Sequence, residues 1–194
     1  SLCYRTTEQI MSAVGALGKV ISTEEFGEDG VGAGELDYRL IGRRPEYHAF
    51  QDQAQQWRWI AQQLDPNQAD LFDGTAILCA TKREVQDAMN YLRQYQLGYC
   101  DLEQYDGEPR PGVKVGTMKR AKSLEFYRVF VPNLGGQSRI EALGDEDLFI
   151  EAASELYVAM SRARDHLILS GIGYPTYLLK DATQSLSITD HSND

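Results

Sequence analysis

The stretch Glu155-Leu-Tyr-Val-Ala-Met-Ser-Arg-Ala-Arg-Asp-His166 predicts a helix that ends in arginines and runs straight into the apolar strand 167–169. Apolar residues recur in this helix at three- and four-residue spacing: Ala153, Leu156, Tyr157 and Met160. The spacing predicts one buried helix face and places Arg162 at the C-terminal end. A cation in the last turn is favoured by the helix dipole by about 0.3–1 kcal/mol, so Arg162 alone indicates only a helix end.

Length and composition are those of a globular protein. The 194 residues are 42% hydrophobic and 25% charged, which suits one domain with a substantial core. A net charge of -10 argues against a nucleic-acid surface over the whole molecule, so any phosphate contact needs a local basic patch. The sequence has no bilayer-spanning apolar run and no signal peptide, so we expect a soluble, cytoplasmic protein without a membrane partner. Three cysteines without metal-ligand spacing argue against disulfides and a metal site: Cys3, Cys79 and Cys100.

Short apolar runs that alternate with amphipathic helices predict the fold class. Residues 75–80 suit a strand buried on both faces, and Thr81 with Glu84 forms a capping box that starts a helix ending near Gly98. Further strands follow, so the sequence predicts an α/β domain with a mainly parallel sheet flanked by helices. Ligands of such sheets bind at the carboxyl ends of strands, where we place the polar segment before strand 128–131. The other expected elements are helices 6–17 (opened by Thr6 and Gln9) and 50–64, and strands 38–41, 47–50, 99–102 and one from Val113.

Two motifs near the ends of the chain point to one family. The segment from Tyr157 to Arg164 resembles the last motif of the UvrD/Rep family of superfamily 1 DNA helicases, which is close to Tyr-Val-Ala-x-Thr/Ser-Arg-Ala. Tyr4-Arg5-Thr6 resembles the family motif Asn-Tyr-Arg-Ser/Thr, with Cys3 where asparagine is usual. Read alone, either motif could be an ordinary helix end, so a third match in the correct order makes the resemblance specific.

The third match is Thr117-Met-Lys-Arg-Ala-Lys-Ser-Leu-Glu-Phe126, which resembles the family motif Thr-x-His-x-x-Lys-Gly-Leu-Glu-Phe. Lys119 replaces the histidine and Ser123 replaces the glycine. If position 123 needs a left-handed backbone, serine there costs about 1–2 kcal/mol. The basic residues expected to supply local positive charge on this acidic protein are Lys114, Lys119, Arg120 and Lys122.

The ordered motifs imply the second RecA-like domain (P-loop NTPase type) of such a helicase. In the family the first-motif tyrosine, here Tyr4, packs on adenine, and the glutamate, here Glu125, approaches the nucleotide sugar. Arg5 and Arg162 would be the catalytic pair that binds ATP and neutralises its terminal phosphate. The resemblance assigns single-stranded DNA contacts to Thr117, Lys119, Arg120 and Lys122.

The sequence lacks the phosphate loop Gly-x-x-x-x-Gly-Lys-Ser/Thr and a magnesium-binding Asp-Glu motif. We therefore expect the C-terminal part of a longer ATP-dependent DNA helicase, with residues 1–184 as the domain and 185–194 as a disordered tail. ATP and Mg²⁺ would be shared with an N-terminal RecA-like domain that holds the metal, and the isolated chain would hydrolyse ATP negligibly. The alternative is a stand-alone, noncatalytic RecA-like module that binds DNA or a partner protein, as the departures at Cys3, Lys119 and Ser123 hint.

Overall fold

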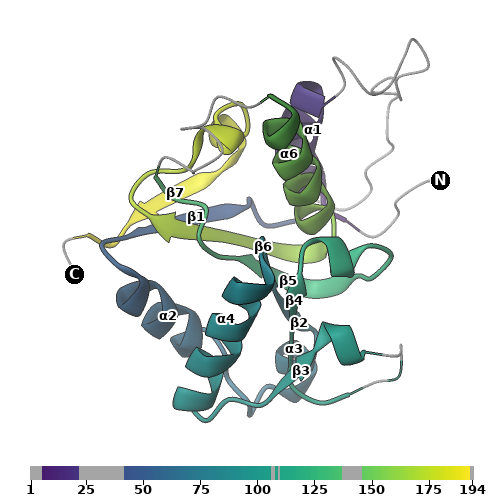
Figure 1. Cartoon of the computed structure of the whole chain (residues 1–194), viewed down its shortest axis with the longest axis vertical. Helices are drawn as coiled ribbons and strands as arrows, with labels where there is room; N and C mark the ends of the chain where they lie inside the picture. Colours follow the sequence, from purple (N-terminus) through teal and green to yellow (C-terminus); the bar gives the residue numbers. More distant parts are fainter. Residues whose placement is uncertain (1–5, 22–41, 106–107, 109, 137–145, 193–194) are drawn as a thin grey trace.

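Parallel strands form the centre of the fold, seen here in a computed structural model (Figure 1). The structure describes residues 6–21, 42–105, 108, 110–136 and 146–192. Within these residues a seven-stranded sheet has the order β3-β4-β2-β5-β6-β1-β7, and every neighbouring pair is parallel. Its strands are β1 (Glu46–Phe50), β2 (Thr75–Cys79), β3 (Tyr99–Asp101), β4 (Val113–Thr117), β5 (Phe126–Val131), β6 (Ala163–Ile172) and β7 (Ser187–Asp190). The predicted α/β fold with a parallel sheet is confirmed.

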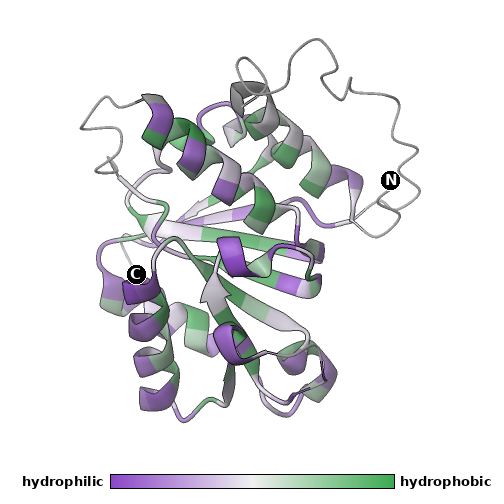
Figure 2. Ribbon diagram, turned by 45° about the vertical axis from the view of Figure 1, so that its right-hand side comes forward, coloured by the Kyte–Doolittle hydropathy of each residue, from purple (hydrophilic) through white to green (hydrophobic). Residues whose placement is uncertain are grey.

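Helices cover both faces of this sheet (Figure 1). They are α1 (Glu8–Ile21), α2 (Gln53–Gln62), α3 (Ala69–Asp73), α4 (Lys82–Gln94) and α6 (Glu146–Met160), with single 3₁₀ turns at η1 (Leu102–Gln104), η2 (Lys119–Ala121), η3 (Tyr177–Leu179) and η4 (Thr183–Ser185). Alternate residues of β5 point to opposite layers, because Val129 packs in the core under α1 and α6 while Phe130 packs under α2 and α4. Figure 2 shows the corresponding pattern, with hydrophobic central strands and helices that alternate hydrophobic and hydrophilic residues.

The predicted helix starts are partly right. The Thr81 capping box of α4 is complete, because the Thr81 hydroxyl accepts from Glu84 N and the Glu84 carboxylate accepts from Thr81 N. The Thr6–Gln9 box is wrong: the Thr7 hydroxyl accepts from Ile10 N, and the Gln9 side chain instead accepts from Gly42 N at 2.8 Å. The predicted strand 38–41 lies outside the described residues.

Helix α1 packs directly on α6. The ring of Tyr157 lies 3.4 Å from where a Cβ on residue 18 would stand, so the small Gly18 lets the aromatic ring approach the α1 backbone. Ile10, Ala13, Val14 and Leu17 supply the buried face of α1. On α6, Ala153, Leu156 and Met160 are fully buried as predicted, which couples the two helices through one continuous apolar layer.

Strand β7 differs from the predicted disordered tail at 185–194. Residues 187–190 pair with β1, and Ser187 N donates to Pro45 O at 2.8 Å. All four side chains of β7 are exposed, so no alternation of buried and polar residues marked the strand in the sequence. Its position depends on backbone pairing and on the residues that follow it.

The carboxyl end of β6 meets another segment at unusually short backbone distance. Leu134 N donates to Ser170 O at 2.8 Å, and Gly135 forms an antiparallel bridge with Pro175. A Cβ on Gly171 would lie 2.1 Å from Gly135 N, so this approach requires glycine. The contact fixes the chain beyond β5 against the end of β6.

Candidate functional site

The polar segment between β4 and β5 crosses one face of the sheet. Strand β2 lies between these two strands, so residues 118–125 run from the carboxyl end of β4 to the amino end of β5. Met118 and Ala121 are buried in the core under α6 and anchor the segment. The prediction that this segment lies at the carboxyl ends of the strands is therefore right for Thr117 and wrong for Glu125, which lies at the amino end of β5.

Lys119 forms two ion pairs with α6. Its Nζ lies 2.7 Å from Glu151 Oε1 and 2.9 Å from Glu155 Oε1. Hydrogen bonds to Glu151 and Glu155 raise the pKa of Lys119, although its side chain is 64% exposed and the pairs add little stability. A phosphate that approached Lys119 would compete with two carboxylates.

The other basic residues of the motif differ in their availability. The Lys122 side chain is exposed, whereas the Arg120 guanidinium donates to Tyr105 O at 3.1 Å. Thr117 Oγ1 accepts from Arg120 N at 3.2 Å and so closes the turn. Lys114 was expected to add surface charge, but it is buried and its Nζ donates to Asp73 O and Gly112 O; burial lowers its pKa. The surface charge therefore comes from Lys119, Arg120 and Lys122.

Ser123 has a left-handed backbone, with φ of 72°, so the cost that the sequence analysis made conditional on this conformation applies. Replacing this exposed serine by glycine should raise the free energy of unfolding by about 0.5–1 kcal/mol, because relief of the strained backbone outweighs the added freedom of the unfolded chain. Urea denaturation measures the change.

Ser154 in the interior of α6 provides the matched control for Ser123→Gly. Ser154→Gly should lower the free energy of unfolding by about 0.5 kcal/mol, because glycine disfavours a helix interior. If Ser123→Gly and Ser154→Gly changed the free energy of unfolding in the same direction, the left-handed backbone of Ser123 would not explain the effect.

Arg162 lies in the turn between α6 and β6. The predicted helix extended through the arginines, but α6 ends at Met160 and Arg164 belongs to β6. Arg162 Nε donates to Val158 O at 3.1 Å, and its Nη2 donates to Ser161 Oγ at 3.0 Å. In this conformation the guanidinium therefore caps the last carbonyls of its own helix.

Two motif segments meet at the amino edge of the sheet. Phe126 N donates to Arg162 O at 3.0 Å, and Arg162 Nη1 lies 3.4 Å from Leu124 O. The exposed side chain of Glu125 belongs to the same edge. Tyr4 and Arg5 lie outside the described residues, so the structure does not place them. The residues brought together are thus Arg162 and the end of the segment that carries the basic side chains.

Two exposed tyrosines, which no sequence pattern indicated, lie beyond the carboxyl end of β6. Tyr174 is 76% exposed and Tyr177 is 57% exposed. The Tyr177 ring contacts Phe149 of α6 with centroids 5.9 Å apart, and Lys180 Nζ lies 5.0 Å from its centroid. Exposed aromatic rings beside a cation can stack nucleic-acid bases. Their spacing matched no motif, so only their exposure reveals them.

The described part of the chain contains neither a candidate metal site nor a helix suited to cross a membrane. No group of three or more His, Cys, Asp or Glu side chains there could hold a metal ion. Among the helices of that part, none has the length and apolar character needed to cross a membrane.

Part of the chain matches a known protein family, and its fold is similar to that of solved structures. Residues 89–174 match the family model of the UvrD-like helicase C-terminal domain, which confirms the family resemblance. The C-terminal domain of a possible DNA helicase from Lactobacillus plantarum WCFS1 is similar in structure, with TM-score 0.68 and 22% identity over 96% of this chain and 98% of that one. The C-terminal domain of the DEAD-box protein Dbp5 gives TM-score 0.48 and 12% identity over 79% of this chain and 92% of that one. A search of curated proteins finds no match. The RecA-like fold is confirmed.

Proposed function

We propose, because residues 89–174 match the family model of the UvrD-like helicase C-terminal domain, that this chain is the second motor domain of an ATP-dependent DNA helicase. The observation that carries the proposal is the meeting of Arg162 with the end of the basic segment at one sheet edge. ATP would bind between this edge and an N-terminal RecA-like domain that holds most of the Mg²⁺ ligands.

Arg162 would act on ATP by neutralising charge on the transferred phosphate, together with Arg5. To do so its guanidinium must leave the Val158 carbonyl and the Ser161 hydroxyl, which are neutral acceptors. A guanidinium can bind a phosphate through two parallel N–H···O bonds and is attracted by its negative charge, which a carbonyl and a hydroxyl do not offer, so the exchange is favourable when the cleft closes. Glu125 would contact the sugar and Tyr4 the adenine ring.

Single-stranded DNA would contact the basic segment through Thr117, Lys119, Arg120 and Lys122. Helix α6 connects this surface with the nucleotide side, because Glu151 and Glu155 bind Lys119 and the same helix ends beside Arg162. If a DNA phosphate bound Lys119, the ion pairs of Lys119 with Glu151 and Glu155 would break. Binding of DNA at Lys119 would thus change the contacts of α6, the helix that ends beside Arg162.

Replacing Lys122 by alanine should weaken binding of single-stranded DNA and lower the magnitude of its salt dependence by about 0.7 in the log–log slope, as expected for one lost phosphate contact. Fluorescence anisotropy over a range of salt concentrations measures both quantities. Glu151→Gln should strengthen binding, because it frees Lys119 of one competing carboxylate.

Lys82 on α4 serves as the matched control for Lys122, since it is exposed and α4 covers the opposite face of the sheet. Lys82→Ala should leave the salt slope unchanged. Equal losses for Lys82→Ala and Lys122→Ala would show that binding follows net charge alone, and the assigned DNA surface would be wrong.

A noncatalytic RecA-like module is the second candidate. The observations that favour it are the engagement of Arg162 with its own helix and of Lys119 with two glutamates. It differs from the first proposal in one measurable respect: a protein that carries this domain would bind DNA or a partner without DNA-stimulated ATP hydrolysis.

A further inference from the structure

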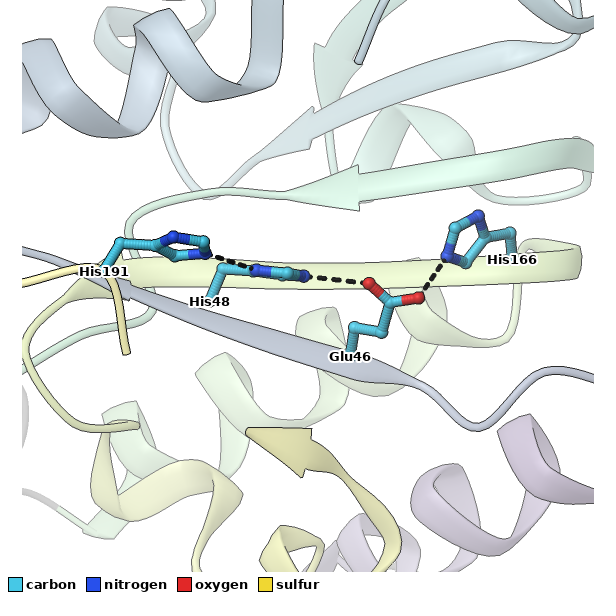
Figure 3. A network of polar contacts seen from close by, with 4 residues as sticks. All are labelled: Glu46, His48, His166 and His191. Atoms are coloured by element: carbon cyan, nitrogen blue, oxygen red, sulfur yellow. Dashed lines mark hydrogen bonds and ion pairs between the residues drawn. The ribbon is translucent and has the colours of Figure 1, made fainter. Parts of the chain in front are cut away.

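One hydrogen-bonded chain contains all three histidines of the sequence (Figure 3). His48 Nε2 lies 2.9 Å from Glu46 Oε2, and His166 Nε2 lies 2.8 Å from Glu46 Oε1. The other ring nitrogen of His48, Nδ1, lies 2.9 Å from Nε2 of His191. The chain thus runs from β6 across β1 to the residue that follows β7.

His191 holds the end of β7 onto β1. Its ring stacks on Phe50 with centroids 4.9 Å apart and planes within 6°, and its N donates to Ala49 O at 2.9 Å. Gln55 of α2 donates to the His191 carbonyl. The four side chains of β7 are themselves exposed, so attachment of this strand depends on its backbone bonds and on His191.

Glu46 sets the proton positions in this chain. A carboxylate accepts hydrogen bonds, so His48 and His166 each present a protonated Nε2 to it. Hydrogen bonds from His166 and then His48 hold the pKa of Glu46 well below its usual range. Neutral His48 therefore has a bare Nδ1, which accepts a proton donated by His191 Nε2.

The facing nitrogens of His48 and His191 can share only one proton. If one ring becomes charged, the facing nitrogen of the other ring still accepts and the bond survives. If both rings become charged, both facing nitrogens carry protons and the bond is lost, with two cations left in contact. The docked strand therefore binds at most one extra proton on this pair, whereas the detached strand allows two.

We propose that His48 and His191 form an acid-sensitive histidine clamp, which holds β7 on β1 near neutral pH and releases it when both rings are protonated.

The two carboxylates beside the histidine clamp each stay with their own histidine when β7 detaches, because Glu46 and His48 share β1 and Asp190 directly precedes His191. Glu46 faces His48, but it already accepts from His166 as well. Asp190 accepts from the Ser192 backbone, and its charge favours protonated His191 whether β7 is docked or detached. Helix α2 packs against the pair through Trp59, 4.1 Å from His48 between ring centroids, and through Gln55; neither side chain titrates. Both carboxylates thus act on the docked and the detached strand alike, and the difference between the two states comes from the facing nitrogens of His48 and His191.

Release of β7 should follow proton linkage. Because the detached state binds one more proton, its population relative to the docked state should rise up to tenfold for each pH unit below the second protonation. Histidines in general titrate between about pH 5 and 8, which sets the range to examine. Lowering the pH should therefore weaken the docking of β7 on β1, and raising the pH should restore it.

Amide hydrogen exchange of the full chain at about pH 7.5 and about pH 5 tests the proposal, with rates corrected for the intrinsic effect of pH. The amides of residues 187–191 should lose protection in acid while those of β2, in the centre of the sheet, keep theirs. Unchanged protection at 187–191, or parallel loss in β2, would overturn the proposal.

Two variants separate the clamp from general acid effects. His191→Phe keeps an aromatic ring to stack on Phe50 but has no nitrogen, so its β7 opening should not depend on pH. His166→Gln, which alters the other side of Glu46, should retain the acid response because His166 belongs to β6 and bonds Glu46 on the side away from His191. A full acid response in His191→Phe would assign the release to another group.

Discussion

Replacing Arg162 by alanine should lower DNA-stimulated ATP turnover by about 10³–10⁵, measured in the protein that unites this domain with its phosphate-loop domain. An arginine that neutralises the transferred phosphate acts mainly in the transition state, so kcat should fall far more than the affinity for ATP. Loss of the cap on Val158 O should cost only about 1 kcal/mol of stability, so unfolding would not explain the effect.

Arg164 is the matched control, because it is an exposed arginine only two positions along, at the start of β6. Arg164→Ala should leave turnover within about twofold. Arg162→Lys should recover only a small part of the activity, since lysine keeps the charge without the planar fork. Near-normal turnover in Arg162→Ala would refute the catalytic role and favour the noncatalytic module.

Replacing Gly171 by alanine should lower the free energy of unfolding by about 3 kcal/mol or more. The added Cβ would lie 2.1 Å from Gly135 N and 2.5 Å from Gly135 Cα, both backbone atoms that a rotamer change cannot move aside. The bridge between Gly135 and Pro175 would have to open. Urea denaturation monitored by circular dichroism measures the loss.

Gly15 allows the same substitution where the structure has room. It lies within α1, and a Cβ on it would meet nothing within 4 Å. Gly15→Ala should therefore raise the free energy of unfolding by about 0.5–1 kcal/mol. If Gly171→Ala proved as mild as Gly15→Ala, the close backbone approach at the end of β6 would not be a real constraint.

Local signals in the sequence predicted most of the sheet. The capping box of Thr81 and Glu84 and the apolar run of β2 depend on residues close together in the chain, and both are confirmed. The replacement of a usual glycine by Ser123 raised the question of a left-handed backbone there, and the structure answers it with a positive φ. Strand β7 was missed because its exposed side chains have no core-facing pattern.

The candidate site was less accessible to prediction, because its contacts join residues distant in sequence. Glu151 and Glu155 follow Lys119 by about thirty positions, and no local pattern indicates that helix α6 would bring them to it. The turn of Arg162 onto the Val158 carbonyl depends on where the helix ends, which sequence patterns locate only within a few residues. The family motifs predicted the site residues, and the structure shows which neighbours engage Lys119 and Arg162.

The packing of α1 on α6 has a mechanical consequence. In the sequence, Arg5 lies three positions before the start of α1, and Arg162 lies two positions after the end of α6. The two helices share a buried interface that includes the Tyr157 ring against Gly18, so sliding one past the other would disrupt close packing. We therefore expect α1 and α6 to move together as one rigid unit. Under the proposed function, Arg162 at the end of α6 would therefore move together with α1 as well as with its own helix.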